Sequence, residues 1–421
     1  MIAFALSRDP RKARKLAEEI AQRQKHRFTK PIKRAELETR LGYACIIARQ
    51  GEIVSSVDAI ASCRTIPENP NFLKELSRIN NVEGLSAKLN EFKLFFSGIV
   101  ASTDSVILFR DHVGHVPLAY GRIGRDYVSA LERHALAFEA ELLPPGSLLL
   151  IEEQRYEVVK WYRPVPRKGD NLKKMLSEAL IQAVEKLIPE KCSIAFSGGL
   201  DSSLLAYLAL KIGKRLEAFV TGFEGCLDHA WALEAADLLG LNLKVIKLTE
   251  EEVLEAVQLL RKFLPRKNAM DLAIASIFYI VSKNSSYKHV ITGQGSDELF
   301  GGYWKYANAL EKYGIGKVAE LMKKDIENLH VVNIERDELA SALAGSQLIA
   351  PYLDRDIYEL ALSIDPELKV RKIDGEIVRK WILREVAKEL GLPDKLVERP
   401  KKAAQYSSGI LKRLRKLLEK S

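Results

Sequence analysis

The sequence has little of what disulfide-bonded, zinc-binding or membrane-spanning proteins need. Only 4 of its 421 residues are cysteine, and none shows the C-x-x-C spacing of a zinc site. No uncharged apolar run reaches the roughly 18 residues of a membrane span, and the apolar start of the chain is too short for a signal peptide. We therefore expect a cytoplasmic globular protein with buried thiols and no membrane partner.

Positive charge is concentrated near the two ends of the chain. Residues 1–40 contain 12 Lys and Arg against 5 Asp and Glu, and residues 399–421 contain 8 against 1. Such clusters can attract nucleic acid. A solvated helix face is the stronger interpretation, because the C-terminal basic residues alternate with Leu411, Leu414, Leu417 and Leu418. Nucleic acid stays an open partner through these basic termini, but it is not the preferred one.

The pattern of strands and helices changes at a proline-rich linker, Trp161 to Gly169. Before it, one long polar helix over 8–27 precedes short strands, predicted at 43–47, 52–57, 94–99, 106–109, 127–129 and 147–151. After it, helices and strands alternate from residue 172 to residue 292, which predicts a parallel α/β sheet with crossover helices. Residues beyond 303 should be mainly helical, apart from a non-helical stretch at 350–354. The expected domains are 1–165 and 166–421.

The most informative stretch is S-G-G-L-D-S-S at residues 197–203, between an apolar strand and an apolar helix. Two glycines let a ligand approach the main chain, and the amides of the helix start would face an anion together with the serine hydroxyl groups. Asp201 fits beside phosphates only with a bridging cation such as Mg²⁺. A tight turn with a serine N-cap is the plainer alternative. No lysine follows, as it would in a Walker A loop, and the string instead resembles the PP-loop of ATP pyrophosphatases.

A second stretch, T-G-Q-G-S-D-E-L-F-G-G-Y at residues 292–303, follows the last strand predicted before residue 292. Ligands of open α/β sheets bind at the carboxyl ends of the strands, so loops 197–203, 221–228 and 293–302 should converge. Asp297 then gives a second carboxylate beside Asp201, and the two could hold Mg²⁺ across a pyrophosphate. A helix-capping turn with Ser296 as N-cap is the alternative.

Together these stretches resemble the asparagine synthetase family, whose synthetase domain pairs S-G-G-L-D-S with G-E-G-S-D-E-[LV]-F-G-G-Y. The likeness covers most of 172–409. Residues 350–354 resemble the family's V-P-F-L-D, residues 381–385 its h-I-L-R-E, and Arg399-Pro400-Lys401 its R-x-K. The resemblance implies a five-stranded parallel nucleotide-binding sheet of the PP-loop type with a helical covering.

The resemblance also implies roles for individual residues. Phe196 and Thr221 would line the adenosine of ATP, and Ser197, Gly198, Gly199, Asp201 and Ser202 would bind its triphosphate. Thr292 and Gly293 would complete the nucleotide pocket, and Gly295 and Ser296 are further expected nucleotide-binding residues. Asp201 and Asp297 would ligate Mg²⁺. Lys401, with Lys402 as the alternative, would stabilise charge on the α-phosphate. Gln294 takes the place of a catalytic residue.

Two departures from the family weaken the likeness. Gln294 stands where the family has Glu, and an amide cannot take up a proton. Asp271 is a candidate replacement base, although a helix N-terminal acid is the simpler interpretation.

The N-terminal domain departs further, because Ile2 and Ala3 stand where glutamine-hydrolysing members have a cysteine nucleophile. R-D-H-V-G-H-V-P-L at 110–118 and L-P-P-G at 143–146 still resemble family motifs. This predicts a shortened, Ntn-hydrolase-like glutaminase domain of the α+β class without its catalytic residue. Cys45 and Cys63 are better interpreted as core thiols than as substitutes.

The resulting hypothesis is an ATP- and Mg²⁺-dependent ligase that adenylates a small carboxylate, most simply aspartate, and forms an amide with free ammonia or a substrate amine. The alternatives are a β-lactam-synthetase-like ring-closing ligase, a tRNA-modifying PP-loop enzyme and a catalytically silent nucleotide-binding protein. The sequence leaves open whether the chain forms a homodimer.

Overall fold

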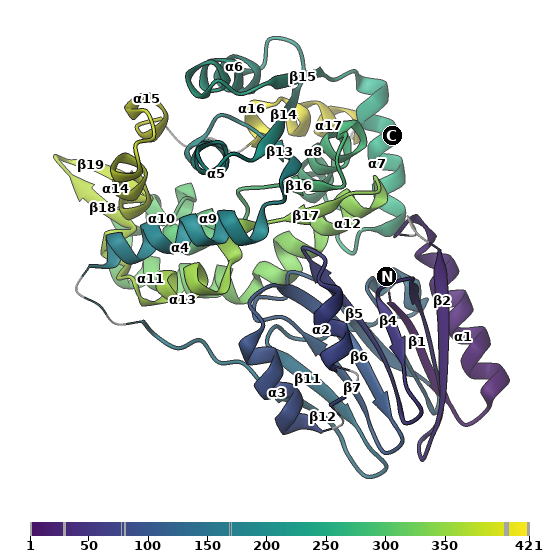
Figure 1. Ribbon diagram of the computed structural model, residues 1–421. Coiled ribbons are helices and arrows are strands. Elements are labelled where there is room, and N and C mark those ends of the chain that lie inside the picture. Colours follow the sequence, from purple (N-terminus) through teal and green to yellow (C-terminus); the bar gives the residue numbers. More distant parts are fainter. Residues whose placement is uncertain are drawn as a thin grey trace. The chain divides into compact units, whose positions relative to one another are not determined.

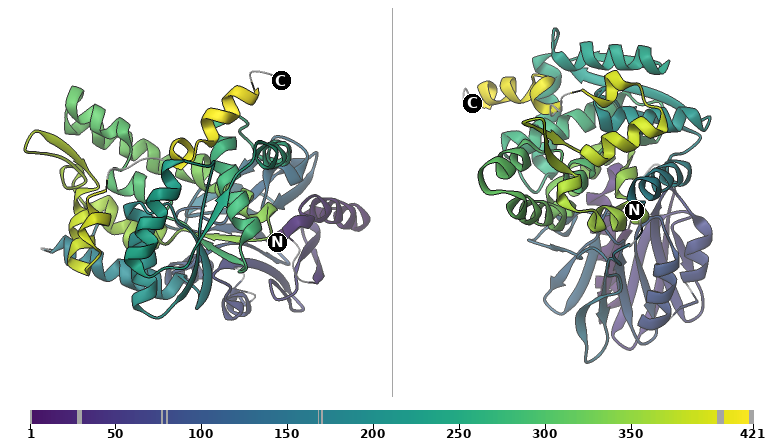
Figure 2. Two further views of the ribbon diagram at one scale, coloured as in Figure 1. Left: turned by 90° about the horizontal axis from the view of Figure 1, so that it is seen from above. Right: turned by 90° about the vertical axis from the view of Figure 1, so that its left-hand side faces the viewer.

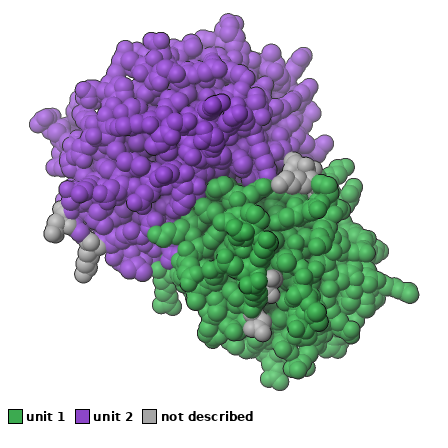
Figure 3. All heavy atoms as spheres, in the orientation of Figure 1, with its two compact units in different colours: residues 1–163 green, residues 164–421 purple. Residues whose placement is uncertain are grey.

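The computed structural model describes residues 2–27, 31–76, 78–79, 81–167, 169, 171–399 and 404–418. It divides into two compact units, residues 1–163 and 164–421 (Figure 3). The division falls inside the linker that the sequence pattern indicates, just before the boundary expected at residue 165.

Unit 1 contains two six-stranded antiparallel sheets, ordered β10-β8-β9-β1-β3-β2 and β12-β11-β7-β6-β5-β4 (Figure 1). The strands are β1 (Ile2–Ser7), β2 (Ile32–Thr39), β3 (Gly42–Arg49), β4 (Ile53–Ser55), β5 (Ala59–Ile66), β6 (Phe95–Ser102), β7 (Val106–Arg110), β8 (Ala119–Ile123), β9 (Asp126–Ala130), β10 (Glu141–Leu142), β11 (Ser147–Ile151) and β12 (Tyr156–Lys160).

Helices cover the sheets of unit 1. Helix α1 (Pro10–Arg23) places Ala13, Ala17 and Ile20 against apolar residues of β1, β3 and β9. It is shorter than the helix predicted over 8–27, because Asp9 caps its first turn and a 3₁₀ turn follows at Lys25–Arg27. Helices α2 (Pro70–Leu76) and α3 (Val82–Glu91) complete the unit, and α2 packs on β5.

The six strands predicted for this unit are present as β3, β4, β6, β7, β9 and β11, with shifted ends. Among the strands that were missed, β5 and β12 lack period-two alternation of burial, whereas β2 shows it at Ala35, Leu37 and Thr39 and could have been found. Strand β5 is buried at every position although it contains Ser, Arg and Thr, and β12 is largely exposed. A pattern of alternate apolar residues identifies strands with one buried face, and these strands have two such faces or none.

Unit 2 is built on a five-stranded parallel sheet ordered β15-β14-β13-β16-β17 (Figures 1 and 2). Its strands are β13 (Lys191–Ala195), β14 (Arg215–Gly222), β15 (Leu243–Lys247), β16 (His289–Ile291) and β17 (Gln347–Ile349). Four of them agree with the sequence pattern within one residue or two. This parallel sheet, together with the antiparallel sheets and helices of unit 1, confirms the predicted fold class of an α/β domain preceded by an α+β domain.

Helices make up most of the rest of unit 2. They are α4 (Leu172–Leu187), α5 (Leu200–Lys211), α6 (Leu227–Leu239), α7 (Glu250–Phe263), α8 (Ala269–Asn284), α9 (Ser296–Phe300), α10 (Trp304–Tyr313), α11 (Ile315–Leu329), α12 (Glu335–Leu343), α13 (Arg355–Ser363), α14 (Trp381–Leu390), α15 (Asp394–Val397), α16 (Ala404–Ser407) and α17 (Ile410–Leu418). A π-helical turn at His330–Ile334 joins α11 to α12.

The main core of unit 2 lies between the sheet and α7, α8 and α17. Ile410, Leu411 and Leu414 of α17 are fully buried there, whereas its basic residues are exposed. This arrangement is the amphipathic helix with a solvated basic face that the leucine spacing favours. None of the helices in the described residues is long and apolar enough to cross a membrane.

Two features beyond residue 303 differ from the expectation of a mainly helical remainder with one non-helical stretch at 350–354. Strand β17 precedes a 3₁₀ turn at Pro351–Leu353, so the stretch at 350–354 is partly helical. A hairpin forms from β18 (Val370–Ile373) and β19 (Glu376–Arg379). Its turn is Asp374-Gly375, both with positive φ, and an Asp-Gly pair is a recognised hairpin signal that could have found it.

Candidate active site

The loops that follow β13, β14 and β16 line one cavity of about 510 Å³ at the carboxyl edge of the sheet. The sequence-predicted residues among its walls are Phe196, Ser197, Asp201, Ser202, Thr221, Thr292, Gly293, Gln294 and Asp297. Gly198, Gly199, Gly295 and Ser296 lie in the same loops but are not among the wall residues. Lys401 and Lys402 lie outside the described residues.

The first loop needs its glycine at position 198. Gly198 has φ 65°, and an added Cβ would lie 2.6 Å from the carbonyl oxygen of Trp231. Gly199 is the N-cap of α5 and gives no side-chain cap. The alternative of a serine N-cap is therefore wrong, and the amides of the first turn of α5 keep no such side-chain partner. An uncapped helix start beside serine hydroxyl groups suits an anion.

Arg399 holds this loop against α6. Its Nη1 donates to the carbonyl oxygens of Gly198, at 2.5 Å, and Trp231, at 3.1 Å. The guanidinium carbon also lies 4.2 Å from the centre of the Trp231 ring. Burial lowers the pKa of Arg399 to about 10. The R-x-K resemblance identified this residue as part of a motif but gave no role for it.

Two carboxylates that the sequence paired are joined by a lysine that it missed. Lys380 Nζ donates to Asp201 Oδ1 at 2.5 Å and lies 2.7 Å from Asp297 Oδ1. It also donates to Ser296 Oγ at 3.0 Å, and Ser296 Oγ donates to Asp201 Oδ1 at 2.9 Å. Ser296 therefore contacts Asp201 and does not cap α9. The N-cap residue of α9 is Gly295, which has no side chain to cap the helix. The only sequence signal for Lys380 is its place directly before W-I-L-R-E.

This approach of lysine and carboxylates depends on Gly302. A Cβ there would lie 1.8 Å from Asp297 Oδ1 and 2.2 Å from Lys380 Cε. In the glycine pair of the second motif, Gly302 therefore has a packing role at the carboxylates, whereas Gly301 ends α9.

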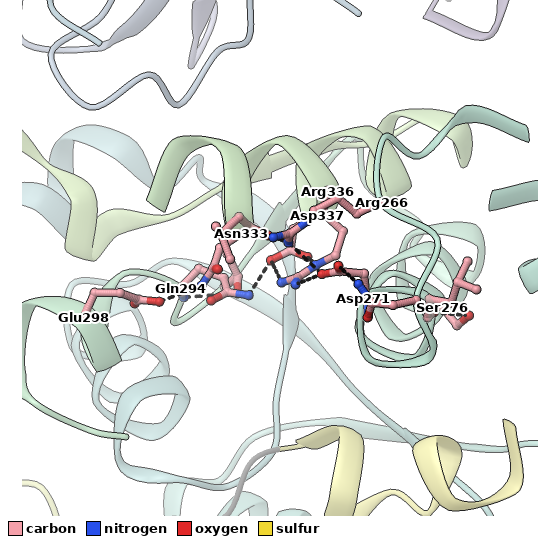
Figure 4. Close-up of polar contacts among 12 residues, drawn as sticks. Arg266, Asp271, Ser276, Gln294, Glu298, Asn333, Arg336 and Asp337 are labelled. Carbon is pink, nitrogen blue, oxygen red and sulfur yellow. Dashed lines mark hydrogen bonds and ion pairs between the residues drawn. The ribbon is translucent and has the colours of Figure 1, made fainter. Parts of the chain in front are cut away.

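A second set of polar and charged residues, drawn in Figure 4, includes Arg266, Asp271, Gln294, Asn333 and Arg336 of the cavity wall. Gln294 Nε2 donates to Asp337, whose carboxylate also accepts Arg336 Nε at 2.7 Å. Arg336 Nη1 donates to Asp271 Oδ1 at 2.9 Å, and Arg266 Nη2 donates to the same oxygen at 2.8 Å. Burial raises the pKa of Asp337. Gln294 is thus an N–H donor to a buried carboxylate.

Asp271 has the helix N-terminal position that its sequence context favours. It lies in the first turn of α8, and its amide donates to the Asn268 side chain. Because two guanidinium groups share its carboxylate, Asp271 is held as an ion-pair partner, which makes it a poor candidate for the replacement base.

Glu298 is buried behind two residues that line the cavity, Tyr303 and Asn333. Its Oε1 accepts Tyr303 Oη at 2.5 Å and Asn333 Nδ2 at 2.6 Å. Burial, followed by repulsion from Asp297, raises the pKa of Glu298 to about 7. Asn333 and Arg336 come from the π-helical turn and α12, a charged run that gave no local signal of a site.

Unit 1 contains no reactive thiol among its described residues. Ile2 and Ala3 are fully buried in β1. Burial raises the pKa of Cys45 to about 12 and that of Cys63 well above its ordinary value. In unit 2, Cys192 is buried, but Cys226 is only half-buried, contrary to expectation.

The R-D motif of unit 1 is structural. Arg110 donates to the carbonyl oxygens of Gly114, Val116 and Leu143. Asp111 accepts the amides of three residues in the following loop, Val113, His115 and Val116. The residues that resemble family motifs here therefore hold the loop in place.

Comparisons with known proteins agree with the geometry of unit 2. A family model described as asparagine synthase matches residues 175–317 and 311–421. A Methanocaldococcus jannaschii protein, provisionally named asparagine synthetase [glutamine-hydrolyzing] 1, is 31% identical over 76% of this chain and 69% of its own length. An asparagine synthetase [glutamine-hydrolyzing] of Sandersonia aurantiaca is 29% identical over 73% of this chain, which spans 62% of that relative.

Among solved structures, a glutamine phosphoribosylpyrophosphate amidotransferase from B. subtilis aligns with a TM-score of 0.31 and 11% identity, covering 69% of this chain and 81% of that one. A score this low carries no argument about either unit.

Proposed function

Because the chain belongs to the asparagine synthase family, we propose that it is an ATP- and Mg²⁺-dependent ligase that adenylates a carboxylate and then forms an amide. The carboxylate oxygen attacks the α-phosphorus of ATP, the bond to the β-phosphate breaks, and pyrophosphate leaves. A nitrogen nucleophile then attacks the acyl carbon, the bond to AMP breaks, and the nitrogen loses a proton.

The observation that carries this proposal is the meeting of Asp201, Asp297 and Lys380 beside the glycine loop. Asp201 and Asp297 lie in the first turns of α5 and α9, which follow β13 and β16, and Lys380 directly follows β19. The three groups lie where phosphates would meet the start of α5. Positive charge is held between the two carboxylates, so the position suits a cation. Phosphoryl transfer depends mainly on such placement of charge.

The apolar walls of the same cavity suit a nucleoside. Phe219 of β14 and Ile274, Phe278 and Val281 of α8 lie along it. Thr221 Oγ1 is buried, lines the cavity and has no hydrogen-bond partner in the described part of the chain. A buried hydroxyl group without a partner is costly, and a bound adenosine would supply one.

Asp201 and Asp297 are also the residues that would hold Mg²⁺. Magnesium in such sites takes one or two carboxylates and completes its shell with phosphate oxygens and water, which fits a pair of acids without further ligands. When bound, Mg²⁺ supplies charge neutralisation at the phosphates. Lys380 limits how far the two carboxylates can separate, and Ser296 fixes the rotamer of Asp201.

Lys401, or Lys402 beside it, is proposed to stabilise the charge that grows on the α-phosphate. Gln294 cannot accept the proton that the nitrogen loses, so a different group must take it. The nitrogen source is proposed to be free ammonia or an amine of the substrate, because Cys45 and Cys63 are buried thiols of raised pKa. The resemblance makes aspartate the first carboxylate to test.

ATP–pyrophosphate exchange with a panel of carboxylic acids tests the proposal. Exchange that depends on one acid and on Mg²⁺, and that Asp201→Ala abolishes, supports a carboxylate-adenylating ligase. Exchange that appears only with tRNA would instead support a tRNA-modifying enzyme. If no acid and no tRNA gives exchange while ATP still binds, the chain is a silent nucleotide-binding protein.

A further inference from the structure

Two acids, Asp271 and Asp337, belong to the same contact network as Gln294, and other side chains already occupy both carboxylates. Asp271 accepts Arg266 and Arg336 at Oδ1, and Asn268 Nδ2 donates to its Oδ2 at 2.6 Å. The carboxylate of Asp337 behind it takes Arg336 and Gln294. The negative charges of Asp271 and Asp337 are therefore already balanced by arginine side chains and are not available to a ligand.

The remaining carboxylates of the cavity wall are engaged elsewhere. Asp201 and Asp297 share Lys380 and belong to the proposed metal position. Asp228 lies in the first turn of α6, after the nucleotide-lining strand β14. In the described part of the chain, a substrate ammonium group placed near Gln294 would consequently meet only carboxylates that arginine side chains already pair.

Two amide side chains belong to the cavity wall in this contact network. Gln294 and Asn333 both line the cavity. Each directs its NH₂ group to a buried acid, Gln294 to Asp337 and Asn333 to Glu298. Neither side-chain oxygen has a hydrogen-bond partner within the described part of the chain. These oxygens can accept a neutral N–H, but they carry no charge to balance an ammonium.

Arg266 offers the complementary group. Its side chain is 39% exposed and lines the cavity. Both of its bonds, to Asp271 and to the carbonyl oxygen of Val332, use Nη2. Nε and Nη1 have no partner in the described residues, and an arginine with two free N–H directions matches a carboxylate.

Resting on the proposed ligase function, we infer that the acyl substrate is an N-acylated dicarboxylic acid rather than a free α-amino acid. One carboxylate is adenylated, the second lies on Arg266, and the amide N–H donates to the oxygens of Gln294 and Asn333. A free ammonium group would lose its hydration in this cavity without gaining an anionic partner, which is unfavourable.

Exchange measurements on the full chain with Mg²⁺ and ATP test the inference, using N-acetylaspartate, aspartate and succinate as the acids. We expect kcat/KM for N-acetylaspartate to exceed that for aspartate by about tenfold or more, the factor that corresponds to 1.4 kcal/mol. Equal or better exchange with aspartate overturns this inference and leaves the ligase proposal standing. Exchange with none of the three, and with no other acid, overturns both.

The variant Arg266→Met tests the contact with the second carboxylate. Arg336 still pairs Asp271 in this variant, so the fold should survive, and the melting temperature checks this. We expect KM for N-acetylaspartate to rise about tenfold with KM for ATP unchanged. The control is Arg215→Met, at the exposed start of β14, which should change neither constant. An unchanged KM for N-acetylaspartate in Arg266→Met would overturn the assignment.

Discussion

Two acidic pairs at the candidate active site are each bridged by one cation. Lys380 joins Asp201 to Asp297, and Arg336 joins Asp271 to Asp337. The side chains of the first pair are 12% and 19% exposed, whereas those of the second are 6% and 0% exposed. The first pair is open to a ligand and the second is closed.

The choice of cation agrees with this difference. A lysine ammonium is a compact point charge on a flexible stem, and it can give way when another cation arrives. An arginine fork fixes both partners through several N–H groups, as Arg336 does with two bonds to Asp337 and one to Asp271. The Lys380 pair is therefore arranged for binding, and the Arg336 pair for holding the wall around Gln294 in place.

The largest effect is expected when the open pair is broken at Asp297. We expect Asp297→Asn to lower the rate of ATP–pyrophosphate exchange about 1,000-fold, the scale on which removal of one electrostatic contact to reacting groups acts. Asp365→Asn, an exposed acid at the start of a 3₁₀ turn, is the matched control and should exchange normally. A rate within tenfold of the parent would show that Asp297 is not at the phosphates.

The two bridging cations can be compared directly through stability. We expect Arg336→Met and Lys380→Met each to cost about 3–5 kcal/mol of unfolding free energy, because each leaves acids buried without their partner. Excess Mg²⁺ should restore stability only in Lys380→Met, by about 2.7 kcal/mol at a concentration of 100 Kd. Urea denaturation with Mg²⁺ and with EDTA measures both changes.

Rescue of both variants by Mg²⁺, or of neither, would remove the distinction between an open and a closed pair. Rescue of Arg336→Met alone would reverse it. The control is Lys305→Met, which removes the surface ion pair between Lys305 and Asp325. This variant should lose less than about 1 kcal/mol of unfolding free energy, and Mg²⁺ should not change its stability.

The sequence pointed to both acids of the open pair but only to Asp271 of the closed pair, and it linked neither Asp337 nor Arg336 to the site, for a physical reason. The glycine loop and the stretch around Asp297 can be recognised in the sequence because each consists of consecutive residues. Close approach of a ligand to the backbone restricts which residue types can occupy such a stretch. The contacts of Lys380 with Asp201 and of Asp337 with Gln294 join residues far apart in sequence. From the sequence alone, the charged residues of α12 are indistinguishable from those of a solvent-exposed helix face, although the structure buries Arg336 and Asp337.

The same reason explains the errors in the fold. The parallel strands β13, β14 and β15 lie between clear helices, so their positions could be predicted closely. Strand β17 has only three residues, and β5 has buried polar side chains, so neither shows a readable period. For Lys401 the sequence supplies only a hypothesis, because that residue lies outside the described part of the chain.

The smallest expected effect concerns Gln294 itself, the position where family resemblance predicts Glu. Gln294→Glu would place a second carboxyl group against buried Asp337, and we expect a loss of about 1–3 kcal/mol. The new carboxyl group would have a folded-state pKa raised above its unfolded value, so stability should fall further as pH rises from about 5 to about 8. Unfolding measured at both pH values checks the sign of this pH dependence.

Adding Asp337→Asn to Gln294→Glu should remove the pH dependence, since the neutral amide can donate to the new carboxylate. If Gln294→Glu alone is as stable as the parent at both pH values, then the hydrogen bond to Asp337 does not explain why this position carries an amide.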